Sequence, residues 1–174
     1  MRRFTHRGRA LLGIAIAVMG FSLAGVVRAE AQGGWSAKDA SALKGYSLTM
    51  GKLKRTNDAM IEFARLEETR DDFADDEGAT QSIDAMVTRI NAVPAARAIL
   101  KKQGLATREY VLTLFATTHA ATAAYMEDNG QKATGIPVSR AQVEFYKANK
   151  AEIEKMFEER KAASKSDDEE DAEE

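Results

Sequence analysis

The longest stretch without a charged residue lies between Glu109 and Glu127, and its pattern predicts one long helix over about residues 107–129. Thr107 is placed as the N-cap, because a threonine hydroxyl can accept from the free N–H groups of the first turn. Asn129-Gly130 supplies a left-handed stop. A membrane span is the rival interpretation, but the threonines and the histidine of this stretch disfavour it.

This helix has two arcs of different size at 100° per residue. The broad arc carries the larger side chains, which are Leu114, Tyr125, Thr118, Val111, Thr122, Phe115, Met126, His119 and Leu112. The opposite arc carries small ones, which are Ala116, Ala120, Ala123, Ala124, Thr113 and Thr117. Since neither arc is charged, we expect the helix to be covered on most sides, with the small arc admitting a close neighbour.

Four further helices are predicted around it, each from local signals. The first begins at Thr49, where Leu48 and Leu53 occupy staple positions, and ends near residue 70. The second covers about 83–93 and ends before Pro94. Pro94 suits the first position of a third helix, which ends at residue 104. The last follows Ser139, which forms a capping box with Gln142.

These elements predict an all-α fold, a bundle of four to five helices around the central buried helix. The bundle domain is assigned to residues 46–161 and is preceded by a flexible leader at 30–45, in which one helical turn from Ser36 is allowed. Residues 162–174 are predicted to be a disordered acidic tail, because Ala, Ser, Lys and acids bury too little apolar surface.

Residues 1–29 are interpreted as a signal peptide. Four arginines between positions 2 and 9 precede an uncharged apolar run at 10–27, and Val27-Arg28-Ala29 fits the small-x-small cleavage pattern, with Ala31 as a second option. The prediction is a periplasmic or secreted protein, and the alternative is an inner-membrane anchor that stays uncleaved. Because the chain has no cysteine, it has no disulfide, no thiol nucleophile and no lipid-modified cysteine.

Charge changes this picture in one respect. Removing residues 1–29 takes away five arginines and leaves 20 basic against 27 acidic residues, of which seven lie in the last eight positions. The body of the chain is then close to neutral, and the basic face that a nucleic-acid partner requires is not predicted.

His119, Asn57 and Lys150 are the polar residues that interrupt apolar stripes, and their convergence in a small ligand pocket is one hypothesis. The competing interpretation makes His119 a structural histidine, lets Asn57 bond locally and sends the Lys150 ammonium to solvent.

The acidic loop that follows the first helix offers the other candidate site. Its aspartates could attract a divalent cation, although the loop lacks the spacing of an EF-hand. The candidate metal ligands are Asp71, Asp72, Asp75 and Asp76. The alternative is a solvated loop. No nucleophile, zinc or phosphate-loop motif is found, so no catalytic residue and no cofactor is predicted, and an enzyme is the least favoured class.

A resemblance to a group of short secreted bacterial helical proteins without assigned activity covers roughly residues 46–157. It rests on short sequence matches rather than on one motif. These are Tyr46-Ser47-Leu48-Thr49, Arg89-Ile90 with Pro94 and Ala98, Gly104-Leu105 with Glu109-Tyr110, and Pro137-Val138-Ser139 with Phe145-Tyr146. The resemblance implies an exported helical domain and assigns no catalytic residue. A looser similarity is to helical periplasmic chaperones of the envelope stress response, but their Leu-Thr-x-x-Gln motif is missing, since Lys52 follows Leu48-Thr49.

The leading functional hypothesis is therefore an exported, non-enzymatic helical protein that binds another protein or an envelope component, without a nucleic-acid partner. The alternative is a carrier of a small ligand or a divalent metal, with a pocket beside the central helix.

Overall fold

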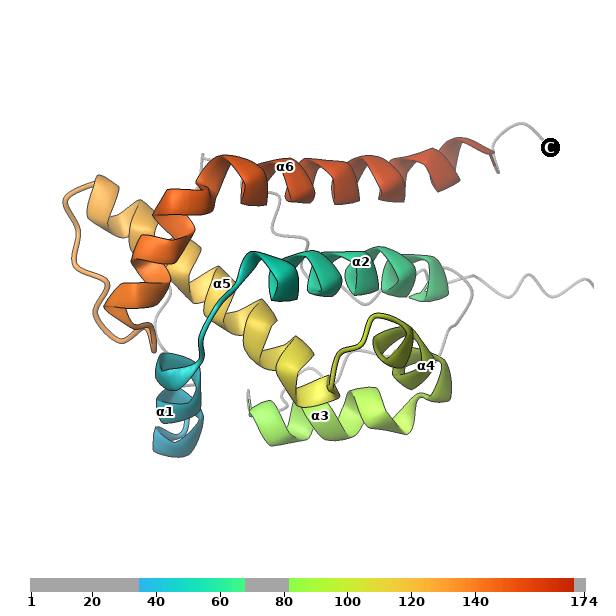
Figure 1. The fold of residues 1–174 in the computed structure, drawn as a ribbon, viewed down its shortest axis with the longest axis horizontal. Coiled ribbons are helices and arrows are strands. Elements are labelled where there is room, and N and C mark those ends of the chain that lie inside the picture. Colours follow the sequence, from blue (N-terminus) through green and yellow to red (C-terminus); the bar gives the residue numbers. More distant parts are fainter. Residues whose placement is uncertain (1–34, 68–81, 171–174) are drawn as a thin grey trace, which may run out of the picture.

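The computed structural model describes residues 35–67 and 82–170, and this part of the chain holds six helices and no strand (Figure 1). The all-α prediction is confirmed. The helices in chain order are α1 (Ala37–Gly45), α2 (Met50–Glu67), α3 (Ile83–Ala92), α4 (Pro94–Lys102), α5 (Thr107–Asp128) and α6 (Arg140–Glu170).

Helix α5 is the centre of the bundle, as predicted, because it packs against each of the other five described helices. Figure 1 shows it crossing diagonally between α6 on one side and α3 and α4 on the other. Its N-terminal half contributes Tyr110 and Val111 to a core shared with α1 to α4. Its C-terminal half contributes four alanines to a second core, shared mainly with α2 and α6.

The small arc of α5 is the buried one. Ala116, Ala120, Ala123 and Ala124 are almost inaccessible, and they pack in one cluster with the larger Val143, Tyr146 and Ile153 of α6. The broad arc is covered less completely: Val111 is fully buried and most of the other residues are half-buried, but Thr118 and Tyr125 are exposed. The physical reason is that α5 meets α6 through its small side chains, so α6 does not cover the broad arc at Thr118 and Tyr125.

The start of α5 also differs from the prediction. Ala106 is the N-cap and provides no side-chain cap, while Thr107 is the first helical residue. The Thr107 hydroxyl donates instead to Asn91 Oδ1 at 2.7 Å, a contact that joins α5 to the end of α3. A long-range partner therefore replaces the local capping bond.

The other local signals are confirmed. The N–H of Lys52 donates to Thr49 Oγ1 (3.3 Å) at the start of α2, and Pro94 is the first residue of α4. At the end of α4, Gly104 has a φ of 65°, and the N–H of Leu105 donates to the carbonyl of Leu100 (2.9 Å). This is a Schellman motif, and its two leucines meet in the core.

The flexible leader predicted at 30–45 is wrong for residues 37–45, which form α1. Ser36 caps this helix, as expected for a helical turn that starts there, since its hydroxyl accepts from the N–H of Asp39 (3.0 Å). Leu43 is fully buried in the first core cluster. Leu43 is the large apolar side chain that docks this helix, and Trp35 and Ala42 pack against the same core.

Gln142 connects the start of α6 to the α1–α2 connection. It forms the predicted capping box, in which its Oε1 accepts from the N–H of Ser139 (2.8 Å). Its Nε2 donates to the backbone carbonyls of Leu43 and Tyr46, both at 2.7 Å. The side chain is 2% exposed, so three bonds from one amide are made away from water.

The end of α6 differs from the predicted disordered tail, because the helix continues through Glu170. Ala, Lys and Glu make up about half of residues 162–170, and their high helix propensity favours extension of the helix. The last four residues lie outside the described part.

Replacing Gln142 by glutamate tests the junction. A carboxylate at this position would face two carbonyl oxygens without a proton to donate, so we expect a loss of roughly 2–4 kcal/mol in unfolding free energy. Urea denaturation of the two proteins measures it. The matched control is Gln131→Glu in an exposed loop, for which we expect a change within about 0.5 kcal/mol. Equal stability of the two variants would contradict the assignment.

Candidate functional site

His119 lies on α5 at the edge of the first core. Its ring packs edge-on against Trp35, with 5.7 Å between centroids, and it also neighbours Phe115. Its Nδ1 is buried without a hydrogen-bond partner in the described part of the chain. Burial lowers the pKa of His119, and the nearby backbone carbonyl of Pro137 partly opposes the shift. The surroundings are those of a neutral, packed imidazole.

The other two residues of the predicted pocket lie in different environments. Asn57 is buried on α2, and its Oδ1 has no partner among the described residues. Lys150 is at the surface, with a side chain 53% exposed and an ion pair to Glu154 at 3.7 Å. The structure therefore does not bring Lys150 into a pocket, and no interaction links Asn57 to His119 in the described residues.

A small hollow does lie next to Trp35, the residue that packs on His119. It has a volume of about 210 Å³ and is lined by Trp35, Ala40, Lys44, Gly135, Ile136 and Pro137. This volume is below the range of about 300–1,000 Å³ that is usual for ligand pockets. None of the three predicted pocket residues lines it.

The predicted metal ligands Asp71, Asp72, Asp75 and Asp76 lie outside the described residues. In the described part, no group of three His, Asp or Glu residues could hold a metal ion. No described helix is long and apolar enough to cross a membrane.

The broad arc of α5 offers a surface that the sequence did not single out. We call it the α5 strip, and it consists of Leu114, Thr118, Thr122 and Tyr125 of that arc with the adjacent Ala121, which also packs against the second core. Every one of these residues is partly or fully exposed, and Tyr125 reaches 44% exposure. The strip runs along about three turns of one helix and carries no charge.

The threonine hydroxyls of the α5 strip donate hydrogen bonds within the helix. Thr118 Oγ1 donates to the carbonyl of Leu114 (3.0 Å), and Thr122 Oγ1 donates to the carbonyl of Thr118 (2.9 Å). Because each donor is used within the helix, the methyl groups are the natural contact surface for a partner. The strip is therefore more apolar than its sequence indicates.

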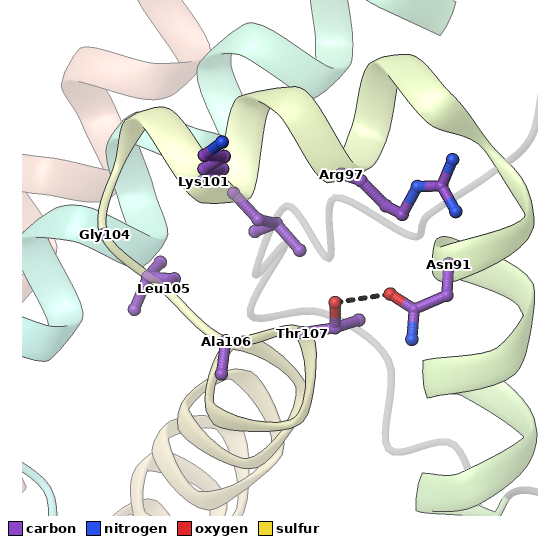
Figure 2. A pocket seen from close by; sticks show the side chains of 8 residues that line it. Asn91, Arg97, Lys101, Gly104, Leu105, Ala106 and Thr107 are labelled. Carbon is purple, nitrogen blue, oxygen red and sulfur yellow. Dashed lines mark hydrogen bonds between the residues drawn. The ribbon is translucent and has the colours of Figure 1, made fainter.

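A second hollow, of about 410 Å³, lies between α3, α4 and the start of α5. Arg97 and Lys101 of α4 line it, together with Asn91 and Thr107 (Figure 2). None of these residues was predicted as a site residue from the sequence. The signal that could have found them is the stretch 85–108, which contains five basic residues and no acidic one.

Comparison of the chain with protein-family models, curated proteins and solved structures gives no match.

The buried imidazole leads to a pH prediction. Since the folded pKa of His119 lies below the ordinary 6.5, the unfolded chain binds the proton first as the pH falls. The stability that the neutral His119 contributes is fully present above pH 6.5. It is lost as the pH falls from 6.5 toward the lower pKa of His119 in the folded state. We expect His119→Gln to reduce the loss of stability between pH 7 and 5, measured by urea unfolding. If the unfolding free energies of the two proteins change in parallel with pH, the prediction is contradicted. The aromatic neighbours Trp35 and Phe115 do not titrate, so they cannot produce the difference.

Proposed function

We propose that this chain is an exported helical protein that acts by binding a partner protein, and that the α5 strip is its contact surface. The partner segment that fits such a surface is an amphipathic helix laid against α5. No catalytic role is proposed.

The composition of the α5 strip carries this proposal. Charged residues make up 30% of the chain, yet the 17 positions from 110 to 126 include none. The structure buries the small arc of this segment and leaves part of the other arc, at Thr118 and Tyr125, exposed to solvent. An exposed uncharged helix face on an otherwise charged protein is typical of an interaction surface.

The spacing of the strip supports a helical partner. Leu114, Thr118, Ala121 and Tyr125 follow one another at intervals of four, three and four residues, which is the spacing of a two-helix seam. Tyr125 would supply the large amphipathic side chain that interfaces favour. Thr118 and Ala121 would let the partner helix approach closely. This arrangement corresponds to recognition of one apolar helix face.

The N-terminal sequence supports the location. The arginines at positions 2 to 9, the apolar run and the small-x-small pattern before Glu30 together favour export. In that location the strip would meet proteins of the envelope or the exterior.

Export predicts a shortened chain. Expression in a bacterium, followed by separation of the periplasmic and membrane fractions, is expected to give a soluble product whose intact mass begins at Glu30 or Gln32. A full-length product in the membrane fraction would replace the signal peptide with an anchor and contradict the proposed location.

The contact surface is tested by photocrosslinking. A benzophenone amino acid in place of Tyr125 is expected to give one specific adduct, identified by mass spectrometry. The same probe in place of exposed Lys155 on α6 is expected to give none. Thr118→Lys should remove the adduct by placing a charge in the apolar seam. Its matched control, Ala148→Lys, is also exposed and should leave the adduct unchanged.

Equal yields at the two probe positions would contradict a defined contact surface. An adduct of twice the mass of the chain would identify a second copy as the occupant and would contradict the heterologous partner.

A further inference from the structure

The basic stretch 85–108 forms one continuous part of the fold, from α3 through α4 to the first turn of α5. Two of its five basic residues are neutralised. Arg108 pairs with Asp84, and Lys102 pairs with Glu62 at 3.0 Å. Arg97 and Lys101 are exposed and form no ion pair with a described residue. The positive charge that remains near the hollow therefore comes from side chains that line it.

The hollow has a polar side as well. Figure 2 shows Arg97 extending from α4 on the side of Asn91, and Thr107 bonded to Asn91 across the gap between α5 and α3. Because Asn91 Oδ1 accepts from Thr107, the two N–H groups of the Asn91 amide are left to donate elsewhere. Lys101 lies at the other end of the hollow in this view.

These groups share one chemistry. A guanidinium, an ammonium and an amide N–H₂ are all donors, two of them are charged, and none of the described residues that line the hollow is acidic. Its volume of about 410 Å³ falls in the usual range for ligand pockets. The ligand that complements these donors is an anion with several acceptor oxygens. Phosphate fits best, because arginine can bind two of its oxygens at once while lysine acts as a mobile point charge.

We propose that the hollow between α3, α4 and the start of α5 is a binding site for a phosphate group, held by Arg97 and Lys101 with Asn91 as a neutral donor. The group could belong to free phosphate or to the headgroup of an anionic phospholipid, which present the same oxygens. The site uses none of the residues of the α5 strip. A result against the proposed partner surface would therefore not contradict the phosphate site, and the reverse also holds.

The test is a titration of the ¹⁵N-labelled full chain with inorganic phosphate at constant ionic strength, followed by amide chemical shifts. Constant ionic strength matters because exposed charges are screened by salt. We expect saturable shifts concentrated at Asn91 and residues 104–107. In the double variant Arg97→Gln with Lys101→Gln, we expect binding to weaken by at least about tenfold, as for the loss of charged hydrogen bonds.

The control pair is Arg89→Gln with Lys155→Gln, which removes the same charge from exposed positions outside the hollow. Arg89 lies two residues before Asn91, about 200° around α3, so it projects away from the site. We expect this pair to change the affinity by less than about twofold. Spectra of both variants without phosphate check that the fold is retained.

A second arm identifies the source of the phosphate group. The full chain is sedimented with vesicles of phosphatidylglycerol and phosphatidylcholine, and with phosphatidylcholine alone. Binding to the anionic vesicles that is lost in the hollow variant and kept in the control variant would support a lipid headgroup, even if free phosphate does not saturate. If neither arm shows binding, or if both variant pairs lose it equally, the proposal is overturned.

Discussion

The fold depends on the small side chains along one face of α5. Ala116, Ala120, Ala123 and Ala124 are nearly inaccessible, so the partner helix α6 has to supply the large side chains of their shared core. This division lets one helix touch all five others. It also shapes the surface, because α6 packs on the small face of α5 and leaves Thr118 and Tyr125 on the opposite side exposed. The α5 strip is therefore a consequence of how the core is built.

The second constraint is the single amide of Gln142. Its oxygen completes a local capping box, and its nitrogen satisfies two carbonyls almost a hundred residues earlier in the chain. Together with the buried Leu43, it fixes α1 against the bundle and so places Trp35 beside His119. A buried amide with all these bonds made contributes specificity as well as stability, since only the carboxamide of Gln or Asn offers an acceptor oxygen and two N–H donors in one group.

Two surfaces of different chemistry result from this architecture. The α5 strip is uncharged and suits an apolar helix, whereas the hollow beside α4 is basic and suits a phosphate group. The acidic residues lie elsewhere along the sequence, concentrated at 67–77 and 167–174. Arg97 and Lys101 form no ion pair with a described residue, so their charge is available to a ligand even though the chain after residue 29 is acidic overall. The two surfaces share no residue, and each can be removed by substitution without the other.

The sequence by itself determined the helices and most of their ends. Pro94, Gly104 and the Ser139–Gln142 box act through bonds within a few residues, so their effect does not depend on the rest of the chain. His119 could likewise be found as the one histidine after residue 29, but its aromatic surroundings could not. Only the tertiary structure decided which arc of α5 is buried, that Thr107 bonds to Asn91, that residues 37–45 form a docked helix, and that Arg97 and Lys101 line one hollow. Each of these rests on contacts between segments that are distant in sequence, where packing and burial outweigh local preference.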